Sequence, residues 1–184
     1  MRIISGKYKG RKLYTATRHI RPTTDRIKEH IFAILQDYVD DRSVIDLFAG
    51  SGSLGIESLS RGASQVTFVE KSFQSIQVLK KNLDRLDIHS DYSIVHSDVL
   101  AFLRINTQPA DFIFADPPFK WNQLNELIEL VFKHNNLCED GIFILESEKS
   151  HRVKWDLPQC EIIKQTQFDR SIITFFGWRK EHEK

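Results

Sequence analysis

Short apolar runs alternate with amphipathic stretches along most of this sequence. Buried-type runs bounded by polar or turn residues predict five strands, at 43–47, 65–70, 92–96, 111–116 and 141–146. Between these runs, apolar residues recur every three or four positions and predict helices at 52–61, 72–86, 99–105 and 124–132. Such alternation is typical of a parallel sheet covered by helices on both faces.

The two ends of the chain depart from this alternation. Strands at 161–167 and 171–178 are separated by three residues, which predicts an antiparallel hairpin. Extended pieces around Gly6 and Gly10 predict a small N-terminal β-hairpin, and a helical apolar stripe follows it. We therefore expect an α/β fold with a doubly wound, mostly parallel seven-stranded sheet, a C-terminal antiparallel hairpin and a small N-terminal β-hairpin. The expected organisation is a basic N-terminal arm at 1–21 and a Rossmann-like domain at 22–184.

Charge is distributed unevenly along this near-neutral chain of 184 residues and formal net charge +1. The first 24 residues contain no Asp or Glu but seven basic side chains: Arg2, Lys7, Lys9, Arg11, Lys12, Arg18 and Arg21. Nucleic acid is a natural partner for a local positive arm of this kind. Charge alone leaves a solvated terminus as the alternative.

Cysteines and leader signals indicate where the protein works. Cys138 and Cys160 are too few and too far apart to predict a disulfide framework or a metal site. The charged N-terminus lacks the apolar region of a signal peptide, and no apolar run is long enough to span a membrane. We expect a cytoplasmic protein that needs no membrane and no metal.

The stretch from Asp46 to Gly55, DLFAGSGSLG, joins a predicted strand to a predicted helix. Its glycines match G-x-G-x-x-G, the dinucleotide fingerprint, but an S-adenosylmethionine site also needs a glycine turn and a ribose-binding acid such as Glu70. Asp46 favours the second ligand, because an acid here repels a pyrophosphate and can hold a cationic ammonium or sulfonium group. A tight turn with no ligand is the remaining alternative.

Acidic residues stand at or just beyond the ends of four successive strands, at Asp46, Glu70, Asp98 and Asp116. Ligands bind outside the carboxyl ends of parallel strands, so we expect these four side chains to line one crevice. A solvated loop acid would explain any one of them taken singly.

The last of these acids opens the tetrapeptide DPPF, Asp116 to Phe119. Pro117 and Pro118 fix two φ angles and stiffen the backbone after the carboxylate. The ring of Phe119 offers a face on which a base can stack. An acceptor carboxylate, a rigid carbonyl and an aromatic ring suit a flat heterocycle with an exocyclic amine. A proline turn with a core phenylalanine is the structural alternative.

Together these motifs resemble those of methyltransferases that modify exocyclic amines of nucleobases. The blocks RIISGKYKGRKL, RPTTDRIKEHIF, DLFAGSGSLGIESLSRGA and FIFADPPF, in this order, are similar to successive motifs of the RsmD family. The resemblance runs from Met1 to about Glu148. It implies an enzyme that uses S-adenosylmethionine to methylate the 2-amino group of a guanine in bacterial small-subunit ribosomal RNA.

The resemblance also assigns roles to matching positions. It places Asp46 near the cofactor amino group, Glu70 on the ribose hydroxyls, and Asp98 and Val99 at the adenine. Gly50, Ser51 and Gly52 would approach the methionine part of the cofactor, and Phe48 would also bind the cofactor. Asp116, Pro117 and Phe119 would hold the target guanine and promote the reaction. The further RNA contacts would come from Arg11, Arg18, Arg21 and Pro118.

Three other functions remain open at this point. An adenine-amine methyltransferase acting on DNA would use the same DPPF chemistry, although no target-recognition domain is visible. An NAD-dependent oxidoreductase would leave DPPF and Asp46 unexplained, and a terminal hairpin is less typical of dehydrogenases. A non-catalytic RNA-binding assembly factor could keep the fold. We expect the RNA partner to be ribosomal RNA within an assembled small subunit.

Overall fold

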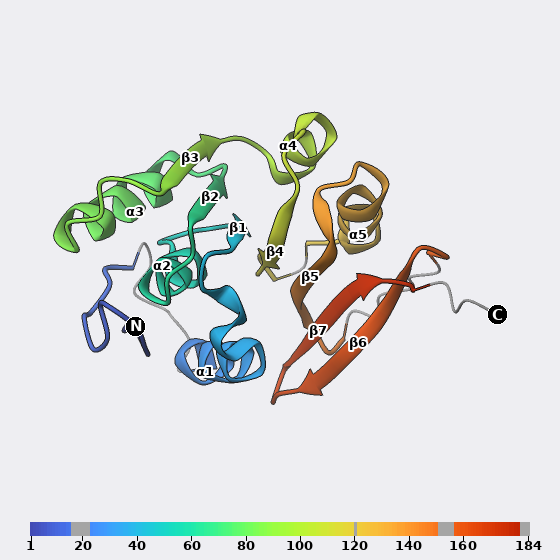
Figure 1. Ribbon diagram of the computed structural model, residues 1–184, viewed down its shortest axis with the longest axis horizontal. Coiled ribbons are helices and arrows are strands. Elements are labelled where there is room, and N and C mark those ends of the chain that lie inside the picture. The colour runs from blue at the N-terminus through green and yellow to red at the C-terminus, as the bar shows by residue number, and fades with distance from the viewer. Residues whose placement is uncertain (16–22, 120, 151–156, 181–184) are drawn as a thin grey trace. The chain divides into compact units, whose positions relative to one another are not determined.

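The computed structural model describes residues 1–15, 23–119, 121–150 and 157–180 (Figure 1). The chain divides into two compact units, Met1–Val99 and Leu100–Lys184. Within the described residues, no helix is long and apolar enough to cross a membrane.

The first unit contains three parallel strands in the order β3-β2-β1. Its elements are α1 (Thr23–Leu35), the 3-10 helix η1 (Gln36–Val39), β1 (Ser43–Leu47), α2 (Ser53–Ser60), β2 (Gln65–Glu70), α3 (Phe73–Arg85) and β3 (Tyr92–His96). Helix α2 packs against β1 and β2, and α3 packs against β2 and β3. Because the three strands are parallel, their carboxyl ends meet at one edge, where Leu47 pairs with Val69 and Glu70 pairs with His96.

Helix α2 approaches β2 closely because Gly55 has no side chain. A Cβ atom at Gly55 would lie 2.2 Å from Cε1 of Phe68 and 2.9 Å from Cγ1 of Val66. The last glycine of the predicted fingerprint therefore serves helix–strand packing, which fixes the start of α2 over the sheet.

The N-terminal segment differs from the predicted β-hairpin in one respect. It closes through a single antiparallel bridge, between Arg2 and Lys12, and not through two strands. The amide groups at its tip turn toward α2, since the Lys7 N–H donates to the carbonyl of Ser60 at 2.7 Å and the Tyr8 N–H donates to Ser60 Oγ at 3.0 Å. Donors used in this way cannot extend a β ladder.

The second unit has the strand order β4-β5-β7-β6. Its elements are α4 (Val99–Ile105, which begins at the boundary), β4 (Ala110–Ala115), α5 (Leu124–Lys133), β5 (Leu137–Glu148), β6 (Cys160–Gln167) and β7 (Ser171–Trp178). Strands β4 and β5 are parallel, whereas β7 pairs antiparallel with both β5 and β6. The predicted C-terminal antiparallel hairpin is confirmed.

Strand β5 begins four residues earlier than predicted and ends two residues later. The pairing with β4 shifts register between Ala110, opposite Leu137, and Phe112, opposite Ile142. This irregularity places the exposed Glu139 and Asp140 inside the strand. Polar residues there interrupt the apolar run, so the pattern reveals only its second half.

The fold class is confirmed as α/β, with the five predicted strands of the alternating region present. Apart from β5, each strand and helix predicted with bounds lies within one residue of its observed limits. The short helix η1 was not predicted.

Candidate functional site

The glycine loop between β1 and α2 has a left-handed backbone at three positions. Phe48, Gly50 and Gly52 have φ angles of 58°, 56° and 84°. Gly52 N–H donates to the carbonyl of Ala49 at 2.7 Å, and Gly52 is also the N-cap of α2. A non-glycine residue held at positive φ stores backbone strain, which is concentrated at ligand sites.

Asp46 lies beneath this loop and is only 2% exposed. Its Oδ2 accepts a hydrogen bond of 2.9 Å from the N–H of Gly55. The pKa of Asp46 is raised to about 7, chiefly by burial; the Gly55 hydrogen bond opposes this shift, and the charge of Glu70 adds to it. A buried acid that holds its proton near neutrality becomes fully ionised when a cation binds beside it.

Glu70 connects the glycine loop to the start of α3. Its Oε2 accepts from the N–H of Gly50 at 2.8 Å, and its Oε1 accepts from the N–H of Ser72 at 2.6 Å. Ser72 is itself the N-cap of α3, where its hydroxyl accepts from the N–H of Ser75. Glu70, the residue predicted to bind the ribose, therefore also fixes the conformation of the glycine loop.

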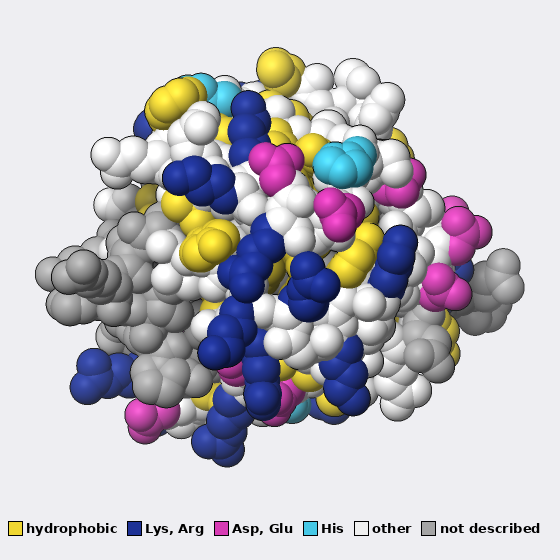
Figure 2. All heavy atoms as spheres, turned by 90° about the vertical axis from the view of Figure 1, so that its left-hand side faces the viewer, with side chains coloured by type: hydrophobic (Ala, Val, Ile, Leu, Met, Phe, Trp, Pro, Cys, Tyr) yellow, Lys and Arg dark blue, Asp and Glu magenta, His cyan; other side chains and the backbone are white. Residues whose placement is uncertain are grey.

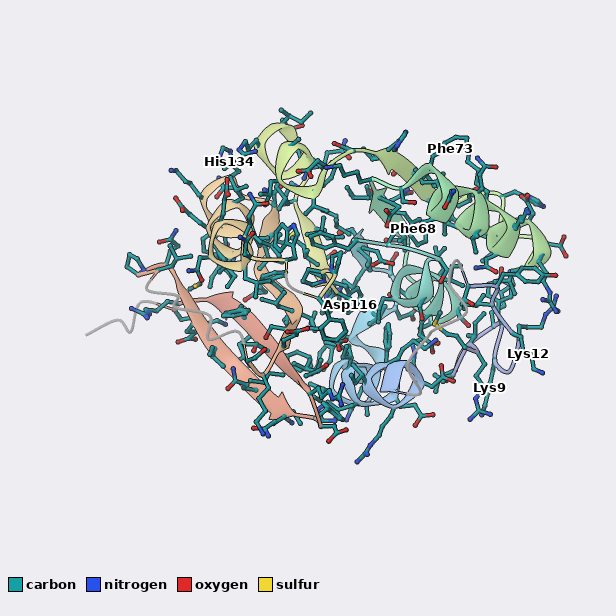
Figure 3. All side chains as sticks on the ribbon, turned by 180° about the vertical axis from the view of Figure 1, so that it is seen from behind. Lys9, Lys12, Phe68, Phe73, Asp116 and His134 are labelled. Carbon is teal, nitrogen blue, oxygen red and sulfur yellow. The ribbon has the colours of Figure 1, made fainter. Side chains whose placement is uncertain are left out.

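Asp98 and Val99 follow β3 at the same edge of the first unit. The Asp98 carboxylate lies 3.3 Å from Nζ of Lys71, and both side chains are exposed, so this ion pair adds little stability. Val99 is buried at the start of α4. Phe73 is 63% exposed, and its ring centroid lies 6.3 Å from that of His96, so an aromatic face lies near these residues (Figure 3).

Asn82 is a component of this site that sequence reasoning missed. The side chain is completely buried on α3. Its Nδ2 donates to the carbonyl of Ser51 at 2.9 Å and to that of Tyr14 at 3.0 Å, and its Oδ1 accepts from the Tyr14 N–H at 2.7 Å. An amide among leucines on the apolar face of α3 was the available signal. Asn82 thus joins the N-terminal segment to the glycine loop.

The DPPF tetrapeptide follows β4, whose last four residues are all buried (Figure 3). The chain turns after it, because the N–H of Trp121 donates to the carbonyl of Pro118 at 3.0 Å. Phe119 is 42% exposed, so the alternative in which it is a core residue is wrong. A pocket in the second unit is lined by Asp116, Pro117, Pro118, Phe119, Trp121, Leu124, Glu146, Ser147, Glu148 and Ser171.

The opposite rim of this pocket comes from β5 and β7, which sequence reasoning did not connect with the site. Antiparallel pairing sets Glu148 opposite Ser171. The hydroxyl of Ser171 donates to Oε1 of Glu146 at 2.7 Å. Polar groups from two strands therefore face a pocket whose other side is aromatic and proline-rich.

The structure thus joins Asp46, Gly50, Ser51 and Glu70 into one hydrogen-bonded loop, and separately places the whole DPPF motif on one pocket. A single crevice shared by all four acids stays a prediction. Arg11 is exposed, and its Nη2 donates to the carbonyl of Arg85 at 3.0 Å. Arg18 and Arg21 lie outside the described residues. Among the residues that the structure does describe, no group of His, Cys, Asp or Glu side chains could hold a metal ion.

Comparison with known proteins shows which family the sequence matches. Residues 1–177 match the family model described as "Conserved hypothetical protein 95". The chain is 38% identical over 174 residues to the ribosomal RNA small subunit methyltransferase D of Escherichia coli K12, covering 91% of this chain and 87% of the relative.

Solved structures show the same likeness in three dimensions. The yhhF protein of Escherichia coli superimposes with a TM-score of 0.87 at 32% identity, covering 98% of each chain. The more distant SMU.776, solved with bound SAH, has a TM-score of 0.70 at 14% identity, covering 92% of this chain and 52% of that one. At 14% identity the likeness concerns the fold alone.

Proposed function

The chain belongs to the family described as conserved hypothetical protein 95, the RsmD family, and we propose that it methylates small-subunit ribosomal RNA. The proposed methyl donor is S-adenosylmethionine, and the proposed acceptor is the exocyclic 2-amino group of a guanine. The observation that carries this proposal is the pocket in which Asp116, Pro117 and Phe119 come together.

The glycine loop is suited to the proposed donor. Asp46 is a buried acid with a pKa of about 7, so an ammonium group beside it would gain a carboxylate partner. Glu70 offers an acceptor, and Gly50, where an added Cβ would meet no atom closer than 3.8 Å, lets a ligand approach the backbone closely. The bound donor supplies a methyl group on a positively charged sulfur, which is the electrophile that an amine requires.

The residues of the DPPF pocket would prepare the amine. An aromatic amine is a poor nucleophile because its lone pair is delocalised into the ring. Hydrogen bonds from its N–H groups to Asp116 and the Pro117 carbonyl favour a tetrahedral nitrogen with a localised lone pair. As the nitrogen gains the methyl group it loses a proton, which Asp116 can accept. Positioning of the reacting groups would supply much of the acceleration.

Phe119 provides the stacking face for the target base, worth about 1–3 kcal/mol. A base in folded RNA must leave its stack to reach such a pocket. We propose that shape and phosphate contacts select the target, and that the substrate is an assembled small subunit or an assembly intermediate.

Transfer of labelled methyl groups tests this function. The acceptors are unmodified small ribosomal subunits, naked ribosomal RNA and duplex DNA, and mass spectrometry identifies the methylated nucleoside. We expect 2-amino-methylated guanine from the ribosomal acceptors. Methylated adenine from DNA would replace the proposed substrate, and tight particle binding without transfer to any acceptor would indicate an assembly factor.

The raised pKa of Asp46 predicts a pH-dependent cofactor affinity. Below pH 7 the carboxyl holds a proton that a cationic ligand must displace, so the affinity should fall on the order of tenfold per pH unit. Calorimetric titration between pH 5.5 and about 8 measures this slope. S-Adenosylhomocysteine, which keeps the ammonium but lacks the sulfonium charge, should show the same dependence.

Asp46→Asn is the matched control for this titration, because the amide cannot ionise. Its affinity should be low and nearly independent of pH. A flat profile in the parent protein would refute the role assigned to Asp46. The same raised pKa makes the ligand-free fold less stable as pH rises from about 4 to about 7, since the unfolded carboxyl loses its proton first.

A further inference from the structure

Helix α3 and the N-terminal segment share a surface that carries positive charge and an aromatic ring. We define the α3 basic face as Arg11, Tyr14, Lys81 and Arg85. Figure 2 shows Lys and Arg side chains gathered on the side of the molecule that these elements occupy in Figure 1. All four residues of the face are exposed, and a surface hollow is lined by Tyr14, Val78, Lys81, Asp84 and Arg85.

Direct contacts hold the face together. Nη2 of Arg11 donates to the carbonyl of Arg85 at 3.0 Å. The guanidinium of Arg85 lies 5.0 Å from the ring centroid of Tyr14, whose side chain is 52% exposed. Stacking and capping align these cations at the end of α3 and leave about half of the Tyr14 side chain accessible to a ligand.

A purely structural role accounts for only part of this arrangement. A cation in the last turn of a helix interacts favourably with the helix dipole, which explains Arg85. It explains neither Lys81, one turn earlier, nor the exposed ring of Tyr14. Asp84 is the acidic side chain that lines the hollow, so the cations outnumber the acids there.

The face is also held in place by buried groups. Asn82 fixes both backbone polar groups of Tyr14, and the Ile4 and Ser5 N–H groups donate to buried Glu57. Cations on a fixed scaffold lose less entropy on binding than cations on a loose tail.

We propose that the α3 basic face binds the phosphate backbone of the RNA, with the ring of Tyr14 beside it. The proposal rests on the proposed function in taking RNA as the ligand. Positive charge concentrated on one face of a near-neutral chain is the electrostatic mark of a nucleic-acid site. An exposed ring among the cations favours RNA over an acidic protein, because unpaired bases stack on aromatic side chains.

The test is the salt dependence of binding to an unmodified small-subunit ribosomal RNA transcript. Each lost phosphate contact should reduce the slope of log K against log salt by about 1, so Lys81→Gln/Arg85→Gln should reduce it by about 2. Since the electrostatic contribution of each phosphate contact vanishes near 1 M salt, the RNA affinity at about 0.1 M salt should fall roughly tenfold for each residue replaced. Lys133→Gln, an exposed lysine on α5, is the matched control and should leave the slope unchanged.

Two further measurements separate charge from structure. Arg85→Lys keeps the charge but loses the planar guanidinium, and it should retain the parent slope. The double variant should bind S-adenosylmethionine as tightly as the parent protein. An unchanged slope in a double variant that methylates RNA would overturn the proposal. The proposal would also be overturned if the double variant lost affinity for the assembled particle but not for the RNA transcript, because the face would then contact protein.

Failure of the proposed function gives a different result. If the parent protein methylates no RNA, the proposed methyltransferase activity is refuted. If the double variant nevertheless binds RNA more weakly than the parent protein, the binding face is supported.

Discussion

Replacing Asp116 with alanine is expected to lower the turnover number of methyl transfer by about 10²- to 10⁴-fold, the range that a positioned proton acceptor contributes. Asp116 lines the pocket with Pro117 and Phe119, and it offers the carboxylate that would accept from the amine. Because the side chains assigned to the cofactor are Asp46, Glu70 and those of the glycine loop, the affinity for S-adenosylmethionine should be unchanged. Single-turnover transfer to ribosomal acceptors and calorimetric titration of the cofactor separate these two effects.

Two variants sharpen this test. Asp116→Asn keeps the shape and an acceptor oxygen but cannot take a proton, so activity between that of the parent and alanine variants would separate positioning from proton transfer. Asp140→Ala removes an exposed acid of the same unit and should leave turnover unchanged, since surface pairs contribute little. A parent-like rate in Asp116→Ala would remove Asp116 from the mechanism.

The features predicted from the sequence depend on short-range patterns. Alternating apolar runs gave the order of strands and helices, and the glycine loop and DPPF are contiguous motifs whose conformation is set by their own glycines and prolines. Gly50, Gly52 and Asp116 could therefore be identified before any fold was known.

The features that were missed depend on contacts between distant parts of the chain. Ser171 reaches the DPPF pocket only because β7 pairs with β5. Asn82 reaches the glycine loop across 31 positions of sequence. The Glu57 side chain accepts from an amide 53 positions away. Register and burial decide these contacts, and a local pattern contains neither.

Glu57 carries the second large expected effect, on stability. Its side chain is completely buried, with Oε2 accepting from the N–H of Ile4 at 2.8 Å and Oε1 accepting from that of Ser5 at 3.0 Å. Nζ of Lys28 lies 3.4 Å from Oε2, and Nε of Arg61 lies 3.0 Å from Oε1. One carboxylate therefore anchors the N-terminal segment to α2, immediately after the glycine loop.

Glu57→Gln should destabilise the fold by about 3–5 kcal/mol, because it leaves the buried ammonium of Lys28 without its counter-charge. Burial already lowers the pKa of Lys28, and the charge of Glu57 opposes that shift. For a chain of this size the loss corresponds to a fall in Tm of roughly 10 °C. Thermal unfolding measures this loss, and hydrogen exchange at the Ile4 and Ser5 amides should accelerate.

Lys28 distinguishes an uncompensated charge from lost packing. Adding Lys28→Met to Glu57→Gln removes the buried ammonium, so the double variant should be more stable than Glu57→Gln alone. Glu29→Gln, an exposed acid on α1, serves as the control and should change Tm little. If the losses of stability from Glu57→Gln and from Lys28→Met simply add, the destabilisation by Glu57→Gln arises from the amides of the N-terminal segment. The carboxylate would then act chiefly as an acceptor that fixes this segment, and with it the α3 basic face, beside the glycine loop.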